Sequence, residues 1–257
     1  MNTEASLTER WIWLTVSLGI AILAIAGRWA LERSSHRSSS QAPPQRTVLD
    51  LPWVVHPLRL LYAVGIPAAA LLWRRILTER GLGLQPLLWL YDDASPIAQA
   101  NWQDWVKDIG WTAVIALSAW IVLAMGDRMI KRRVGAQAPT HHDPGKALRE
   151  AVYHQVHWAF YREPFVLLWG SAMGAWAGLI PVTLEAMMNP ARWEDLQHPS
   201  RGRDLLIRIG LALVGTMLYI QTQNLWLTIL ADATLVWILG QTQTMDHAGF
   251  DRSKSHR

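Results

Sequence analysis

The sequence predicts an all-α fold, a polytopic transmembrane helical bundle of about six spans. Hydrophobic residues make up 51% of the 257 residues and charged residues 17%, against roughly 25% in an average soluble domain. The charged residues are concentrated between long apolar stretches. The chain also has 16 Trp but only 3 Phe, and tryptophan favours the membrane–water interface, where the ends of membrane helices lie.

Long apolar stretches carry the predicted spans, because a membrane helix needs roughly 20 predominantly apolar residues. They cover residues 11–31, 54–73, 109–126, 164–184 and 205–240. One helix over the last stretch would be about 54 Å long at 1.5 Å per residue, far longer than a hydrocarbon core of about 30 Å. We therefore predict a fifth span, a turn at residues 221–224 and a shorter sixth span.

The N-terminal region, residues 1–135, holds the first three predicted spans and a polar linker. Residues 11–31 follow an acidic flank rather than the basic start of a signal peptide, so we predict a retained helix. Residues 32–50 are rich in Ser, Gln, Pro and Arg, which is typical of a linker. Residues 92–108 are polar and predict a loop on the membrane surface.

A second predicted domain, residues 146–240, follows a loop that contains prolines and histidines. Its first part, residues 146–163, predicts an amphipathic helix, and residues 164–184 are uncharged throughout. Residues 241–257 form a polar tail. The basic residues are spread too evenly among the loops for the positive-inside rule to fix an orientation.

Composition excludes several kinds of site. The chain has no Cys, which excludes disulfides, thiolate metal sites and a cysteine nucleophile. The net charge of +4 and the pI of about 9.7 suit a protein beside anionic lipid headgroups. Lys and Arg are dispersed, so we expect no nucleic-acid partner. We expect an integral protein of a bacterial cytoplasmic membrane, whose partners are the lipid bilayer and a membrane protein or peptide.

Asp232 is the clearest ionisable residue inside a predicted span. A lone carboxylate at the bilayer centre costs on the order of 2.5–3.5 kcal/mol, and the default interpretation of such a residue is functional. We expect its side chain to face the bundle and to find a partner. The alternative is a protonated Asp232 that bonds to a neighbouring helix.

A second group of candidate residues lies near the start of the fourth predicted span. A helix places His154 and His157 on one face, and Tyr161 continues the stripe one turn later. Two imidazoles at this spacing can share a metal ion, and ordinary hydrogen-bonded histidines at the interface are the alternative. Glu185 ends the span and faces either a cavity or water at the membrane boundary.

Two segments resemble the CAAX-protease and bacteriocin-processing family of intramembrane endopeptidases. Tyr161 and Arg162 match the end of that family's Glu-Glu-x-x-aromatic-Arg motif. Asn224 begins a segment with a tryptophan, and residues 229–233 then match the frame of the family's Ile-Leu-x-His-Ala motif. The resemblance covers residues 148–240.

The resemblance implies a glutamate that activates water to attack a peptide bond, with histidines holding the site. The chain departs from the family at these positions. The family's two glutamates are replaced by His157 and Trp158, and its final histidine is replaced by Asp232. We therefore expect a catalytically degenerate relative, which scaffolds or binds a partner or lipid.

Two alternatives stay open. One is an active metal- or glutamate-type intramembrane endopeptidase with a rearranged site of His154, His157, Glu185 and Asp232. The other is an accessory subunit of a larger membrane complex. Gly170, Gly174 and Gly178 are spaced four apart and predict a helix face for close packing, either on another chain or within this one.

The candidate residues fall into three groups. The catalytic candidates are His157, Arg162 and Asp232. The binding candidates are His154, Tyr161, Glu185 and Asn224. If the protein uses a cofactor, we expect a divalent metal ion held by His154, His157 and Asp232, since imidazole and carboxylate groups suffice for such a site.

Overall fold

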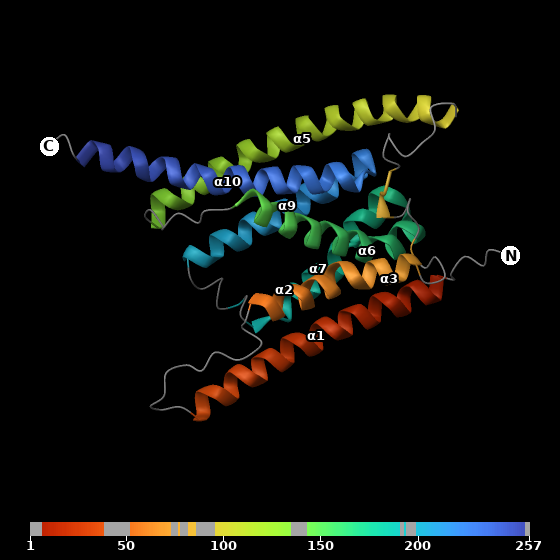
Figure 1. Cartoon of the computed structure of the whole chain (residues 1–257), viewed down its shortest axis with the longest axis horizontal. Coiled ribbons are helices and arrows are strands. Elements are labelled where there is room, and N and C mark those ends of the chain that lie inside the picture. The colour runs from red at the N-terminus through yellow and green to blue at the C-terminus, as the bar shows by residue number, and fades with distance from the viewer. Residues whose placement is uncertain are drawn as a thin grey trace. The chain divides into compact units, whose positions relative to one another are not determined.

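The computed structural model describes residues 7–38, 52–72, 77, 82–85, 96–134, 143–190, 193 and 199–254. These described residues are helical almost throughout and contain no strand, which confirms the predicted all-α class. Figure 1 shows the helices. In chain order they are α1 (Leu7–Ser38), α2 (Pro52–Leu60), η2 (Leu61–Gly65), α3 (Ile66–Leu72), α5 (Pro96–Val134), α6 (Pro144–Ala177), α7 (Leu179–Met187), α9 (Pro199–Thr222) and α10 (Leu225–Lys254).

Within the described part of the chain, four helices are long and apolar enough to cross a membrane, or five if the bent pair of α6 and α7 counts as one span. The four are Leu7–Gly27, Val54–Leu72, Trp102–Ile130 and Leu205–Thr222. Leu225–Gly240 is apolar but shorter. By length and composition, these helices are compatible with an integral membrane protein.

The chain divides into two compact units, and each unit is built from two separate segments. Unit 1 comprises Met1–Leu82 and Val156–Glu194, and unit 2 comprises Gly83–Gln155 and Asp195–Arg257. The first part of α6 therefore belongs to unit 2 and the rest to unit 1. The predicted domain boundary at residues 135–146 lies largely outside the described residues and stays a prediction.

In unit 1, α2, η2 and α3 form one apolar helical run whose middle turn is a π-helix. The π turn comes just before Pro67, which cannot donate the backbone hydrogen bond of a regular α-helix. Such widened turns are rare and often lie at functional sites. This turn carries Tyr62, a residue of the candidate site described below.

The chain doubles back within α6. Gly170 has φ 77° and ψ 173°, a conformation that glycine adopts without steric cost. A Cβ on Gly174 would overlap the backbone of Val166, and a Cβ on Gly178 would lie 2.7 Å from Cα of Arg162. One straight α-helix would separate Arg162 and Gly178 by about 24 Å, so the segment after Gly170 must return along the segment before it.

This hairpin divides the span predicted at residues 164–184 into two arms that run back along each other. Gly170 forms the turn instead of lying on the same helix face as Gly174 and Gly178. These two glycines allow the returning arm to contact the backbone of the first arm. The arm then bends by 43° between α6 and α7. The predicted glycine face therefore serves packing within this chain.

Unit 2 packs α5 against α9 and α10, and α9 also contacts α10. A Cβ on Gly210 of α9 would lie 2.6 Å from the side chain of Leu123 on α5, so these helices approach closely. The structure confirms the predicted turn at residues 221–224, because α9 ends at Thr222 and α10 begins at Leu225. The predicted surface loop at residues 92–108 is wrong from residue 96 onward, where α5 has begun.

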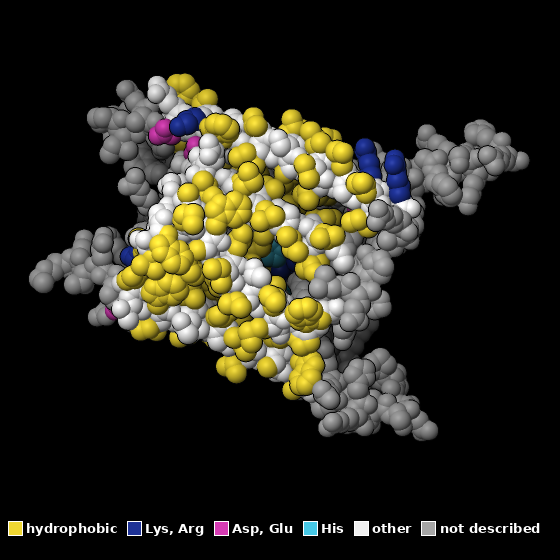
Figure 2. Space-filling view, turned by 180° about the vertical axis from the view of Figure 1, so that it is seen from behind, with side chains coloured by type: hydrophobic (Ala, Val, Ile, Leu, Met, Phe, Trp, Pro, Cys, Tyr) yellow, Lys and Arg dark blue, Asp and Glu magenta, His cyan; other side chains and the backbone are white. Residues whose placement is uncertain are grey.

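Many large hydrophobic side chains are exposed on the described helices. Leu72 is 83% exposed, Leu23 73% and Met173 68%. Figure 2 shows hydrophobic side chains spread over the described part of the face that it draws. Water-soluble proteins rarely expose so much apolar surface, whereas lipid tails solvate it without cost.

Candidate functional site

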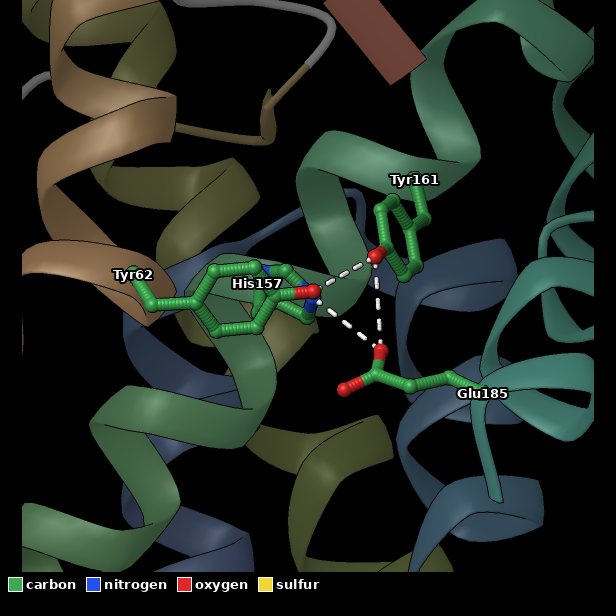
Figure 3. Close-up of polar contacts among 4 residues, drawn as sticks. All are labelled: Tyr62, His157, Tyr161 and Glu185. Atoms are coloured by element: carbon green, nitrogen blue, oxygen red, sulfur yellow. Dashed lines mark hydrogen bonds and ion pairs between the residues drawn. The ribbon is translucent and has the colours of Figure 1, made fainter. Parts of the chain in front are cut away.

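Four polar side chains of unit 1 meet at one place, which we call the unit 1 polar cluster: Tyr62, His157, Tyr161 and Glu185 (Figure 3). Tyr62 comes from η2 and Glu185 from α7. His157 and Tyr161 are four residues apart on α6, so helical geometry places both on one face. The hairpin at Gly170 returns α7 to that face.

The two tyrosine hydroxyl groups connect to the Glu185 carboxylate by hydrogen bonds. The Tyr161 hydroxyl donates to Oε2 of Glu185 at 3.3 Å. It also lies 2.8 Å from the Tyr62 hydroxyl. Either hydroxyl can be the donor in this second contact. The same Oε2 of Glu185 lies 3.5 Å from Nε2 of His157 (Figure 3).

Aromatic rings enclose the imidazole of this cluster. The His157 ring centroid lies 4.6 Å from that of Tyr62 and 4.3 Å from that of Tyr161. His157 and Tyr161 are buried, whereas the Glu185 side chain is 28% exposed. The cluster thus has a buried aromatic interior and a carboxylate that reaches the surface of the unit.

This arrangement can hold or transfer a proton, because a carboxylate, an imidazole and two phenols lie in contact. It also has a structural role, since its bonds connect η2, α6 and α7. A carboxylate that already accepts a hydrogen bond from tyrosine is less available to activate water. The partial exposure of the Glu185 side chain allows a ligand to reach it.

A buried ion pair joins α1 to α6, two residues after Tyr161. Arg10 of α1 lies 3.5 Å from Glu163 of α6, with 6% and 0% of the side chains exposed. Trp11 packs edge-on against Phe165 beside it, with ring centroids 5.0 Å apart. Buried charges need such partners, so the pair fixes α1 on α6.

Arg162, a catalytic candidate, is 3% exposed and lies in unit 1. Its backbone and the first atoms of its side chain pack against Gly178 on the returning arm. The structure therefore places Arg162 inside the helical hairpin.

Asp232 lies in unit 2, on α10, and is 4% exposed. The sequence predicts a polar partner for this buried carboxylate, and the structure provides one. Nε2 of Gln155 on α6 donates a hydrogen bond to Oδ2 of Asp232 at 3.0 Å. His154, the neighbour of Gln155, belongs to the same unit and is half-buried. We call Asp232 and Gln155 the acid–amide pair.

Asn224 organises the turn between α9 and α10. Its Oδ1 accepts the backbone N–H groups of Trp226 and Leu227 at 3.1 and 3.3 Å, which caps the first turn of α10. Its Nδ2 donates to Oε1 of Gln85 at 3.2 Å. This binding candidate is therefore a helix cap with a long-range partner.

Gln85 joins this turn to α5. Its Nε2 donates to Oδ2 of Asp108 at 3.0 Å and to the Thr222 carbonyl at 3.1 Å. The backbone carbonyl of Gln85 accepts a hydrogen bond from Nε1 of Trp226 at 3.1 Å. Gly83, two residues earlier, has φ 76°, and a Cβ there would lie 2.9 Å from the Gln223 carbonyl oxygen. Only glycine fits this close approach.

The structure brings three predicted site residues together, namely His157, Tyr161 and Glu185. His154 and Asp232 belong to unit 2, so the predicted rearranged site that joins them to His157 stays a prediction. Among the described residues, no group of three or more His, Asp or Glu side chains is placed to hold a metal ion. The predicted metal role of His154, His157 and Asp232 stays a prediction.

Three residues whose side chains bond to the side chains of predicted site residues are missing from the sequence-based prediction: Tyr62, Gln85 and Gln155. All three are neutral polar residues inside or beside apolar stretches. The one available signal is that a neutral amide or phenol buried in a span needs a hydrogen-bond partner. No protein-family model, curated protein or solved structure matches the chain.

Proposed function

We propose that this chain is an integral membrane protein that binds a membrane-embedded partner through the surface around Glu185. We further propose that it is a divergent relative of the CAAX-protease family which has lost the peptidase chemistry. Four candidate spans, the bent pair of α6 and α7 and the shorter apolar helix Leu225–Gly240 together support about six membrane-embedded segments.

The partial exposure of the Glu185 carboxylate beside exposed apolar residues is the observation that supports the binding role. The Glu185 side chain is 28% exposed. Met188, three residues later and on the same side of the helix, is an exposed hydrophobic residue, and so is Leu184, the residue before Glu185. A carboxylate on an apolar membrane surface is unfavourable unless a partner satisfies it. An exposed apolar patch with one polar anchor is a typical protein–protein interface.

The buried side of the cluster supports a binding role over a catalytic one. In the family that the chain resembles, the position of His157 would hold a glutamate. Here Tyr161 donates to Glu185 and His157 lies 3.5 Å from it. These contacts hold the carboxylate in one orientation, and a fixed orientation lowers the entropic cost of binding.

Site-specific photo-crosslinking tests the proposed surface. A photoreactive amino acid at Leu184 is expected to capture a protein partner in native membranes. The same amino acid at Leu206 of α9, which is also exposed, serves as the matched control. Glu185→Gln keeps the shape of the side chain but removes its charge. We expect it to reduce the Leu184 adduct roughly tenfold, because a hydrogen bond to a charged group contributes about 1.5–3 kcal/mol.

Two results would contradict the binding proposal. One is an adduct at Leu184 that consists of lipid alone. The other is an adduct that Glu185→Gln leaves unchanged while the variant keeps the thermal stability of the parent protein in detergent.

The second candidate function is a glutamate-type endopeptidase. The observation that favours it is the 3.5 Å separation of Glu185 Oε2 and His157 Nε2. In this reaction Glu185 would take a proton from water as the water oxygen attacks the carbonyl carbon of a peptide bond. The protonated Glu185 would then give this proton to the leaving amine as the C–N bond breaks. The imidazole would hold the carboxylate in place.

A peptidase assay separates the two candidates. The purified full chain is incubated with quenched-fluorescence peptides, one of which ends in a prenylated cysteine motif. The binding proposal predicts no turnover above a protein-free blank. Turnover that Glu185→Gln abolishes and that Glu150→Gln on α6 retains would establish the endopeptidase and overturn the binding proposal.

A further inference from the structure

The acid–amide pair in unit 2 has two buried oxygens without a donor. Asp232 is 4% exposed and Gln155 is fully buried. Gln155 Nε2 donates to Oδ2 of Asp232 at 3.0 Å. The other two oxygens, Oδ1 of Asp232 and Oε1 of Gln155, have no hydrogen-bond partner among the described residues. Buried polar atoms rarely stay unsatisfied.

Nearby hydroxyl groups have already used their protons. On α10, Thr228 donates to the Asn224 carbonyl and Thr234 to the Leu230 carbonyl. On α9, Thr216 donates to the Ala212 carbonyl. A hydroxyl has one proton to donate, so none of these three residues can also donate to Asp232 or Gln155.

We propose that Asp232 and Gln155 form a proton-binding site, in which a single proton on Oδ1 of Asp232 is donated to Oε1 of Gln155. This proton satisfies both unpaired oxygens at once. The Nε2 donation to Oδ2 then closes a cyclic acid–amide pair with two parallel hydrogen bonds. In this step hydronium gives one proton to the Asp232 carboxylate, which becomes a carboxylic acid, and a water molecule is released.

Neighbouring elements hold the amide in position. A Cβ on Gly215 of α9 would lie 2.7 Å from Nε2 and 3.0 Å from Oε1 of Gln155. The Gln155 side chain therefore lies against the bare backbone of α9 and cannot easily turn away.

The charged groups around the pair come from more than one helix. Arg208 of α9 interacts electrostatically with Asp232. From α5, Asp108 is bonded to Gln85 beside the first turn of α10, about 12 Å along that helix from Asp232. Binding of the proton removes the charge of Asp232 from the interior of unit 2, where an ionised carboxylate is unfavourable.

Infrared difference spectroscopy of the purified full chain tests this site. An acid titration is recorded over the pH range in which circular dichroism shows an unchanged helix content. We expect a carboxylic-acid carbonyl band that is lost in Asp232→Asn. Gln155→Leu is expected to move this band to higher frequency, because the carbonyl loses its hydrogen bond. Asp104→Asn, at an exposed position of α5, should leave the band unchanged.

A measurement on the parent protein guards against a variant that fails to fold. Carboxyl-labelled ¹³C aspartate is incorporated, and the resonance with a protonated carboxyl shift is followed across the same range. The proposal is overturned if no aspartate becomes protonated while the protein is folded, which would leave water or a cation as the donor. Glu185→Gln lies in unit 1 and should not alter the signal, so this outcome is independent of the proposed binding role.

Discussion

Single side chains in this protein bury their polar groups as pairs or short chains. Tyr161 is the central example, because its hydroxyl is bonded to both Tyr62 and Glu185. Asp232 follows the same rule with Gln155. The physical reason is that a polar group in a low-dielectric interior is costly without a partner and is stabilised by one.

Removal of one hydroxyl tests the unit 1 polar cluster at this scale. Tyr161→Phe removes the donor to Glu185 and the hydrogen-bond partner of Tyr62, so we expect a loss of about 1–3 kcal/mol in the free energy of unfolding. Tyr62→Phe removes one bond and should cost less. Thermal unfolding in detergent measures both variants and the double variant. Strictly additive effects would contradict a shared chain, because coupled partners are non-additive.

Part of the candidate site can be predicted from the residues alone. His157 and Glu185 stand out because ionisable groups are rare beside membrane spans. Tyr62 and Gln155 do not stand out, because neutral polar residues are unremarkable in a sequence. Their roles depend on contacts between segments that are far apart in the chain, and no local pattern encodes such contacts.

At the scale of helices, composition predicts where apolar segments lie but not how they turn. The split of residues 205–240 follows from length alone, because one helix would far exceed the bilayer. The hairpin in α6 does not follow, because Gly170 lies in an uncharged stretch that has the composition of one span. Hydrophobicity carries no information on the sign of φ, and a glycine at a turn resembles a glycine at a packed face.

Paired glycine substitutions test the hairpin as an element. Gly178→Ala places a Cβ 2.7 Å from Cα of Arg162, so the two arms must separate. We expect a loss of about 1–3 kcal/mol, as for overpacking, measured by thermal unfolding. Gly126→Ala on α5 is the matched control, since no atom lies within 4 Å of its Cβ. It should be neutral or stabilising by roughly 0.5–1 kcal/mol. Equal effects of the two substitutions would argue against the close contact.

At the scale of the whole molecule, each compact unit combines two segments that are far apart in the chain. A sequence-based division into consecutive domains describes such an arrangement poorly, because the contacts within a unit join distant segments. The helical class and the apolar helices are predictable, since both follow from local composition. The membership of each helix in a unit follows from tertiary packing.

The central claim is that the chain doubles back at Gly170, because the meeting of His157, Tyr161 and Glu185 depends on it. The distance between spin labels at Trp158→Cys and Met188→Cys tests it directly by pulsed electron paramagnetic resonance. The chain has no Cys, so the introduced residues are the sole labelling positions. We predict a short distance, because Tyr161 and Glu185 are hydrogen-bonded. A distance near 45 Å, the length of one straight α-helix between these residues, would contradict the hairpin and the site built on it.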